Sequence, residues 1–379
     1  MEYVIHLTEK CNLNCKYCYE NKTDKDISFN NIKSLIDYEI SQKNKYSIIT
    51  FYGGEPLLKI NMIKNTIDYI NKKKCKTKFF FGITTNGTLL DDDIISYMKN
   101  NNFINIGYSI DGMRETYELN RIDTNGKSNY NIVLSNAKKL LDSFDSVVAM
   151  SVVTKNNIVN LSKNVDFLIK FGFKYINLLF DYTYDWKDED LVLIKQQIKE
   201  VSDIYSNKLI HEYDVDIPIL DEKIRTYISE KYDCNNDCNY GMNVINVGTD
   251  GNFYPCVQFV NNDKFIIGNC KDGINMSLRE NLIKNVKKEN NVCKKCNIKK
   301  RCKHTCACRN FLLTGNVNKV SPFTCETEKI FIEVADEMAE KLYKQKSKMF
   351  IQKYYNKNYN ILKGIANRKE GRLHGNKKY

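Results

Sequence analysis

The chain has 379 residues, which is enough for one large domain and a smaller one, each with its own hydrophobic core. A hydrophobic fraction of 42% and an aromatic fraction of 12% are typical of a folded protein and exclude intrinsic disorder. The net charge of +12 belongs mainly to one end, because residues 344–379 hold eleven Lys and Arg against Glu370 alone and carry +10. The remaining residues therefore carry about +2, and nucleic acid is not an expected partner.

The sequence also indicates the compartment. No stretch approaches the roughly 18–20 apolar residues that a membrane helix needs, and the N-terminus lacks the pattern of a signal peptide. We therefore expect a cytoplasmic protein with no membrane partner. The cytoplasm keeps thiols reduced, so fourteen cysteines there indicate metal binding rather than a disulfide framework.

The first 213 residues alternate short apolar runs with helical patterns, which predicts parallel βα units with right-handed crossovers. Such units either close into a barrel or open into a doubly wound sheet, and in both cases function collects at the C-terminal ends of the strands. The predicted strands are Tyr3–Thr8, Ile48–Tyr52, Phe79–Thr84, Ile104–Ile110, Val147–Val153 and Tyr175–Phe180. The predicted helices are 29–43, 61–73, 91–101, 129–142, 159–171 and 190–212.

The pattern changes after residue 213. Cysteines become frequent and long apolar runs disappear, so residues 214–330 form a predicted second domain that needs metal for its stability. A helix is predicted over 326–345, and residues 331–379 form a predicted last segment that contains most of this helix and a basic tail. The basic tail that ends this segment is predicted to be weakly structured.

Three cysteines directly follow the first predicted strand. Cys11, Cys15 and Cys18 have the spacing CxxxCxxC, and three thiolates can hold three irons of a cubane cluster. The fourth iron is then open for chemistry. A structural zinc site would need a fourth ligand, and neither Cys nor His follows closely.

Polar and glycine residues also stand at the ends of the next strands, where they could be simple turn formers if each is taken alone. Their joint occurrence at successive strand ends favours one shared site. These residues are Gly53, Gly54 and Glu55 after the second strand, Asn86 after the third, Ser109 and Asp111 after the fourth with Arg121 downstream, and Ser151 in the fifth.

Together these segments resemble the radical S-adenosylmethionine (radical SAM) superfamily, including Tyr17 before the last cysteine of the triplet. The resemblance implies a partial (β/α)6 TIM-like barrel of the α/β class and a [4Fe–4S] cluster on the three catalytic cysteines. It implies that Gly53, Gly54 and Glu55 meet the amino group of S-adenosylmethionine. The residues implied for its ribose and carboxylate are Asn86, Ser109, Asp111, Ser151 and, downstream, Arg121, with Tyr17 also counted in the cofactor site.

The C-terminal cysteine spacing resembles the SPASM domain of peptide- and protein-modifying radical SAM enzymes. The resemblance implies two auxiliary [4Fe–4S] clusters, which makes three in all. Cys308 lies close enough to Cys306 to exchange roles with it, and Cys75 and Cys270 have no assigned role. The first auxiliary cluster would be held by Cys234, Cys238, Cys256 and Cys306, and the second by Cys293, Cys296, Cys302 and Cys325.

Relatives with this architecture include sactipeptide and ranthipeptide maturases and anaerobic sulfatase-maturating enzymes. The latter carry an Asp after the third cysteine of the first auxiliary cluster, where this chain has Val257. We therefore expect a peptide maturase that uses a 5′-deoxyadenosyl radical to abstract hydrogen from a ribosomally made peptide and install a crosslink, a Cys thioether. The alternatives are oxidation of Cys or Ser to formylglycine and, outside enzymes, a zinc-stapled nucleic-acid-binding protein, because CxxC pairs alone also favour zinc.

The resemblance also implies partners. These are the precursor peptide and a flavodoxin- or ferredoxin-type reductant. Because the chain begins directly with its first strand, we also expect a separate leader-recognition protein or a short peptide.

Overall fold

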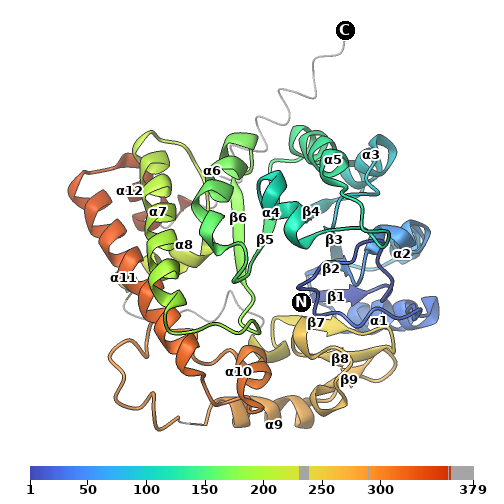
Figure 1. Ribbon diagram of the computed structural model, residues 1–379. Coiled ribbons are helices and arrows are strands. Elements are labelled where there is room, and N and C mark those ends of the chain that lie inside the picture. The colour runs from blue at the N-terminus through green and yellow to red at the C-terminus, as the bar shows by residue number, and fades with distance from the viewer. Residues whose placement is uncertain (230–238, 289, 357, 360–379) are drawn as a thin grey trace.

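The computed structural model describes residues 1–229, 239–288, 290–356 and 358–359 (Figure 1). Six parallel strands lie side by side in chain order, each pairing with the next. A doubly wound sheet would reverse its strand order at a switch point, so this order is that of a barrel wall. β1 does not pair with β6 among the described strands, and the barrel is therefore partial. The strands are β1 (Glu2–His6), β2 (Tyr46–Tyr52), β3 (Lys78–Thr85), β4 (Phe103–Ser109), β5 (Val147–Val153) and β6 (Tyr175–Phe180).

Helices connect these strands, and local signals set their ends. The Ser28 side chain caps the first helix by accepting from Asn31 N, and Asp91 caps another by accepting from Ile94 N. Gly172, in the left-handed region, ends α6. The helices are α1 (Phe29–Ser41), α2 (Ile60–Lys72), α3 (Asp92–Asn100), α4 (Arg114–Asn120), α5 (Tyr130–Ser143), α6 (Leu161–Phe171) and α7 (Asp190–Ile210), with 3₁₀ turns at Pro56–Lys59 and Ile158–Asn160.

The C-terminal region continues the same sheet. β7 pairs in parallel with β1 on the side away from β2, and β8, β9 and β10 follow as antiparallel strands. These strands are β7 (Val244–Val247), β8 (Asn252–Tyr254), β9 (Gly268–Asn269) and β10 (Gly273–Ile274). The remaining helices are α8 (Pro218–Ser229), α9 (Met276–Val286), α10 (Ala307–Thr314), α11 (Pro322–Lys344) and α12 (Lys348–Tyr355), with 3₁₀ turns at Asn239–Gly241, Val257–Phe259 and Asp263–Phe265.

Two hydrophobic cores of unequal size hold the molecule together. The large one fills the barrel wall and its helices and includes the inner stripe of α11, which packs on α7 and α8. The small one lies under the cysteine-rich region and contains five buried residues. A core of this size buries little apolar surface. Its members are Tyr254, Phe259, Phe265, Val286 and Ala307.

The prediction of a weakly structured tail is wrong for residues 348–355. These residues form α12, which packs on α7 and α8. The Lys353 side chain is fully buried, and its Nζ lies 2.8 Å from Asp216 Oδ1 and 3.0 Å from Asp221 Oδ1. A buried ammonium with two carboxylate partners fixes this helix, whereas composition alone shows only a basic segment.

In the described ranges, no helix combines the length and apolar character that crossing a membrane requires.

Candidate active site

The loop after β1 carries the cysteine triplet and is held by both of its flanks. On one side, Gly54 N–H donates to Thr8 O (2.8 Å) and Glu55 N–H to Lys10 O (2.9 Å). On the other side, Asn14 N–H donates to Ile122 O (2.7 Å) in the segment after α4. Backbone contacts to two different βα connections therefore fix the loop at the C-terminal edge of the barrel.

The glycines after β2 are required by close backbone approach. A Cβ on Gly54 would stand 2.1 Å from Lys10 O, and one on Gly53 would stand 2.3 Å from Thr8 O. Gly53 also has φ +125°, which side chains rarely adopt. These glycines therefore let the cysteine loop lie directly on the end of β2.

The Glu55 side chain is fully buried and turned toward the ends of β2 and β3. Its carboxylate accepts from Leu57 N–H (3.0 Å), Thr85 Oγ1–H (2.7 Å) and Asn86 N–H (2.7 Å). Burial raises the pKa of this carboxyl to about 7. These hydrogen bonds tie two strand ends together, and the contact of Glu55 with the amino group of a ligand stays a prediction.

Asn86 contacts the cysteine loop directly. Its Nδ2 lies 3.8 Å from Cys11 Sγ and donates to Asn12 Oδ1 (2.9 Å). The predicted site residue of β3 and the first cysteine of the triplet are thus brought together, although 75 residues separate them in the chain.

Asp111 is the centre of a buried polar group. Its carboxylate accepts from Tyr17 O–H (2.7 Å), Val152 N–H (3.1 Å) and two nitrogens of Arg121 (3.0 and 3.1 Å). Ser151 Oγ–H donates to the Asp111 carbonyl (3.3 Å). Asp111 and Arg121 thus bind one another and hold Tyr17, the residue before Cys18; their predicted contacts with the ribose and carboxylate of a ligand stay a prediction. Ser109, the other predicted residue of β4, is half-buried at the strand end.

The three thiols have the character of cluster ligands. Cys11 and Cys15 are half-buried and Cys18 is exposed. Burial raises the pKa of the Cys11 thiol to about 11 and also raises that of Cys15, so both stay protonated until metal displaces their protons. Within the described residues, no three His, Cys, Asp or Glu side chains converge closely enough to hold one metal ion. A cubane cluster takes one thiolate on each iron, so these three cysteines can serve three of its irons.

Four polar residues beside the triplet were missed from the sequence. His6, at the end of β1, is 1% exposed, and its ring centroid lies 5.0 Å from that of Tyr52. Its Nδ1 lies 3.4 Å from Glu20 Oε1, and Tyr52 shares a hydrogen bond with Tyr19 (2.8 Å between hydroxyl oxygens). Burial lowers the pKa of His6 to about 4 and raises that of Glu20 to about 7. These residues stand at strand ends or directly after Cys18, and those positions could have identified them as candidate site residues from the sequence.

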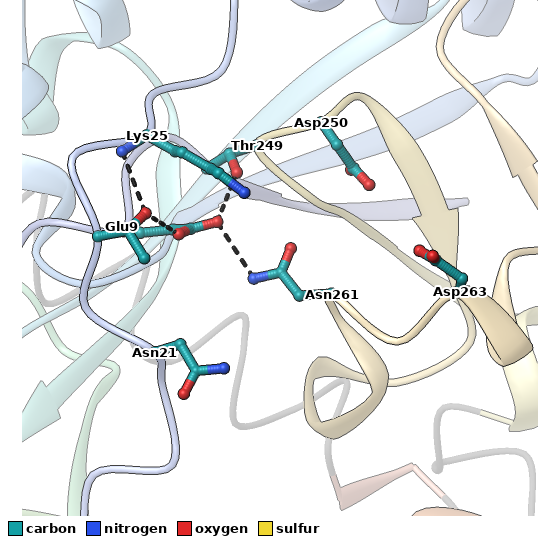
Figure 2. A pocket seen from close by; sticks show the side chains of 8 residues that line it. Glu9, Asn21, Lys25, Thr249, Asp250, Asn261 and Asp263 are labelled. Carbon is teal, nitrogen blue, oxygen red and sulfur yellow. Dashed lines mark hydrogen bonds between the residues drawn. The ribbon is translucent and has the colours of Figure 1, made fainter.

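A polar cavity of about 210 Å³ lies between the cysteine loop and the loop after β7 (Figure 2). Glu9 Oε1 accepts from Thr249 Oγ1–H (2.7 Å) and Asn261 Nδ2–H (3.1 Å), and Thr23 also donates to this carboxylate. Burial opposes ionisation of Glu9, but these hydrogen bonds hold its pKa below the usual value. The first loop and the C-terminal region are thus joined by side chains. The cavity is lined by Glu9, Asn21, Thr23, Lys25, Thr249, Asp250, Asn261 and Asp263.

The C-terminal cysteines form two groups of thiols. Cys306 Sγ lies 3.6 Å from Cys308 Sγ, and Cys308 is also hydrogen-bonded to Cys256. Cys325 lies near Cys293 and Cys296, each of which raises the pKa of its thiol after the larger effect of burial. Cys234 and Cys238 lie outside the described residues.

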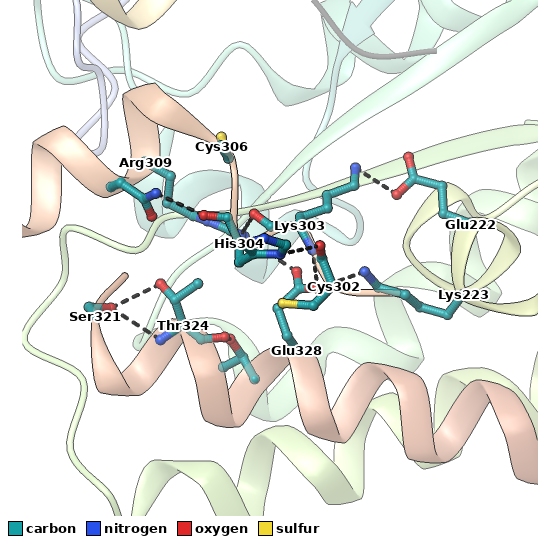
Figure 3. Close-up of polar contacts among 12 residues, drawn as sticks. Glu222, Lys223, Cys302, Lys303, His304, Cys306, Arg309, Ser321, Thr324 and Glu328 are labelled. Atoms are coloured by element: carbon teal, nitrogen blue, oxygen red, sulfur yellow. Dashed lines mark hydrogen bonds and ion pairs between the residues drawn. The ribbon is translucent and has the colours of Figure 1, made fainter. Parts of the chain in front are cut away.

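Cys302, another predicted ligand of the second auxiliary cluster, lies in a buried charged network (Figure 3). Its thiol is hydrogen-bonded to the Glu328 carboxylate. Glu328 Oε2 lies 2.7 Å from Lys223 Nζ, with both side chains 2% exposed, and Glu328 Oε1 lies 3.5 Å from Arg309. Burial opposes ionisation, but the two cations hold the pKa of Glu328 at about 2.

Comparison with known proteins gives the following similarities. Residues 5–168 match the radical SAM superfamily. An uncharacterised protein of Methanocaldococcus jannaschii is 37% identical over 193 residues, covering 50% of this chain and 65% of that protein. A cysteine-type anaerobic sulfatase-maturating enzyme of Clostridium novyi is 28% identical over 182 residues, 45% of this chain and 48% of the enzyme. The chain thus spans between about half and two thirds of these two relatives.

A longer match and two solved structures extend the comparison. The cysteine-type anaerobic sulfatase-maturating enzyme of Clostridium perfringens (strain 13) is 26% identical over 292 residues, 71% of this chain and 76% of the enzyme. Native anSMEcpe with bound AdoMet superposes with a TM-score of 0.78 at 22% identity, covering 90% of this chain and 99% of that one. Streptococcus suis SuiB bound to precursor peptide SuiA gives 0.61 at 17% identity, covering 86% and 75%. These structures share the fold of this chain.

Proposed function

We propose that this chain, whose residues 5–168 match the radical SAM superfamily, is an enzyme that matures a ribosomally made peptide by installing a Cys thioether. This family uses S-adenosylmethionine and a [4Fe–4S] cluster. When bound, the two supply a 5′-deoxyadenosyl radical that removes hydrogen from an unactivated carbon. The match to this superfamily favours the proposal over the zinc-stapled nucleic-acid-binding alternative.

The observation that carries the proposal is the loop of Cys11, Cys15 and Cys18 at the C-terminal edge of the barrel. These thiols would hold three irons and leave the fourth to the substrate side. Gly53 and Gly54 set the loop on the end of β2, and the Asp111 group holds it from the opposite side through Tyr17. Rigid support from both flanks keeps the reacting groups in place.

Two further clusters in the C-terminal region are part of the proposal. Cys256 and Cys306, together with Cys234 and Cys238, would hold the first auxiliary cluster. Cys293, Cys296 and Cys325 would hold the second, and Cys302 would complete it by turning away from Glu328. The grouping of the described thiols supports this division.

A peptide substrate is supported by two of the similar proteins. SuiB is described with a bound precursor peptide, and the Clostridium enzymes are named for maturating a sulfatase, which is itself a polypeptide. We further propose a flavodoxin- or ferredoxin-type protein as the electron donor and a separate protein that recognises the leader of the peptide. The cytoplasm is the proposed location.

Formylglycine formation is the second candidate, because similarity to the sulfatase-maturating enzyme extends over 71% of this chain. Against it, the residue after Cys256 is Val257, which carries no proton acceptor. The two reactions differ in their products, since a thioether keeps the cysteine sulfur whereas formylglycine made from cysteine loses it.

The test uses the full-length protein reconstituted anaerobically with iron and sulfide. Incubation with S-adenosylmethionine, a reductant and small Cys-containing peptides encoded near its gene should give a product lacking two hydrogen atoms per crosslink. Its cysteine should resist alkylation by iodoacetamide. Loss of sulfur would favour formylglycine, and release of 5′-deoxyadenosine without change in any peptide would overturn the peptide proposal. A Cys15→Ala variant is the matched negative control.

A further inference from the structure

A dense group of lysines lies at the end of α9 and in the connection that follows this helix. Residues 284–300 hold seven Lys against Glu289 alone and therefore carry +6. Residues 1–343 carry about +2 in all, so the rest of that stretch carries about −4. The connection runs along the outside of the molecule (Figure 1). Positive charge is thus concentrated on one exposed segment of an otherwise slightly acidic body.

The lysines of this segment face solvent without acidic partners. This differs from α11, where the exposed Lys341 pairs with Asp203 of α7. Unpaired like charges repel one another and cost stability, so they are best explained by a partner of opposite charge. Six lysines of the segment are exposed and pair with no acidic side chain in the described ranges, and together with Val292 we call them the lysine surface: Lys284, Lys287, Lys288, Lys294, Lys295 and Lys300.

An apolar residue on a fixed loop stands among these lysines. Val292 is 80% exposed. Its loop is tied to a neighbouring turn, because Asn290 Nδ2–H donates to Asn318 O (2.8 Å) and Asn318 Nδ2–H donates to Lys288 O (2.6 Å). A small apolar centre inside a polar rim is the usual composition of a protein-binding surface. The lysine surface therefore fits a protein partner with an acidic face.

Thiols of the second auxiliary site lie directly behind the lysine surface. Cys293 follows Val292 in the chain, and the half-buried Cys296 follows Lys294 and Lys295. Burial raises the pKa of the Cys293 thiol and Lys299 acts in the opposite sense, so an ammonium lies near this sulfur. Electron transfer slows steeply with distance. A cluster on these thiols would therefore be well placed to receive an electron from a protein docked on the lysine surface.

We propose that the lysine surface docks an acidic electron carrier of the flavodoxin or ferredoxin type. The carrier loses one electron and the second auxiliary cluster gains it, and no covalent bond changes. Nucleic acid is the other common polyanion, but residues 284–300 contain no aromatic residue and no arginine, the side chains that stack on bases. The inference rests on the electron donor and the second auxiliary cluster of the proposed function.

The test uses the anaerobically reconstituted full-length protein and a recombinant, negatively charged flavodoxin as the probe. Lys294→Glu/Lys295→Glu reverses two charges of the lysine surface, and Lys74→Glu/Lys76→Glu makes the same charge change at exposed lysines elsewhere. Calorimetry gives the affinity, and stopped-flow absorbance gives the rate of reduction by flavodoxin hydroquinone. At low ionic strength the surface pair should lose about tenfold or more in both, and the control pair little. Added salt should bring the wild type toward the surface pair.

Two further variants secure the result. Lys287→Glu/Lys288→Glu repeats the charge reversal farther from the cysteines, in case the first pair lowers the iron content. Cys296→Ala should keep the affinity for flavodoxin and lose the rapid reduction. Unchanged reduction in that variant would refute the electron path through the second auxiliary cluster.

The remaining outcomes separate the inference from its premise. If both surface pairs behave like the wild type, or the control pair loses as much, docking at the lysine surface is refuted. Tighter binding of a single-stranded oligonucleotide than of flavodoxin, lost in the surface pairs, would assign the surface to nucleic acid instead. A wild type with only about four irons lacks the auxiliary clusters, and the premise fails. If flavodoxin docks and reduces the protein but no peptide changes, the inference stands and the proposed peptide function fails.

Discussion

Replacing Asp111 by alanine should destabilise the protein far more than a surface substitution does. The side chains of Asp111 and Arg121 are 0% and 6% exposed, and two hydrogen bonds of 3.0 and 3.1 Å join them. Removing one partner of a buried ion pair leaves the other charge without compensation, which costs about 3–5 kcal/mol. Tyr17 and Val152 N–H lose their acceptor at the same time. We expect a loss of about this size in the free energy of unfolding.

Urea unfolding of the cluster-free protein, followed by circular dichroism, measures this loss. Glu118→Ala is the matched control, because Glu118 pairs with Arg114 at 2.8 Å on the exposed face of α4. An exposed pair of this kind contributes little, because solvent screens the two charges. An Asp111→Ala/Arg121→Met double variant should recover much of the loss, since it removes both buried charges.

The same variants separate a positioning role from direct ligand contact. If Asp111 holds the loop through Tyr17, unfolding stability and affinity for S-adenosylmethionine should fall together and recover together in the double variant. Calorimetric titration of the reconstituted protein gives that affinity. If Asp111→Ala keeps its stability to within about 1 kcal/mol but no longer binds S-adenosylmethionine, the positioning argument is wrong.

Three further predictions follow from the site. Gly54→Ala places a Cβ 2.1 Å from Lys10 O and should displace the cysteine loop, which lowers the iron content and the rate of S-adenosylmethionine cleavage. Gly126→Ala is the control, because a Cβ there would meet no atom within 4 Å, and it should change neither quantity. Cys15→Ala should abolish release of 5′-deoxyadenosine while keeping about eight irons, and turnover by this variant would contradict the assignment. The pKa of Glu328 is lowered from 4.5 to about 2, so its contribution to stability is present above about pH 4.5 and lost as the pH falls toward 2. Glu328→Gln should remove this pH dependence, worth about 3 kcal/mol, from unfolding curves measured across that range.

The barrel was predictable because each of its strands is a short apolar run between helical patterns. Val147–Val153 and Tyr175–Phe180 have the predicted bounds, and the other strands begin or end within two residues of them. α8, α9 and α10 were not predicted, since their apolar faces are narrow. In α9, for example, Val286 is the buried residue. Short helices with narrow apolar faces give a weak periodic signal.

The site was predictable at the level of which residues meet. Parallel strands bring their C-terminal ends to one edge, so Cys11, Asn86 and Asp111 could be placed together from the chain order. Which hydrogen bonds they make could not be predicted. Tyr17 and Asp111 are 94 residues apart, and the inward turn of Glu55 depends on donors from a neighbouring strand end. Those contacts are set by tertiary packing, on which spacing carries no information.

The relation between the triplet and the first auxiliary site follows from the sheet itself. β7 covers the edge of β1 that would otherwise be open, and an uncovered edge strand is a liability in any sheet. β8 pairs with β7 and ends at Tyr254, shortly before Cys256. β1 belongs to the same sheet and leads to Cys11. Glu9 then joins the two loops through Thr249 and Asn261. The triplet and Cys256 therefore both follow strands of one hydrogen-bonded sheet. The fold fixes the distance between them before any metal binds.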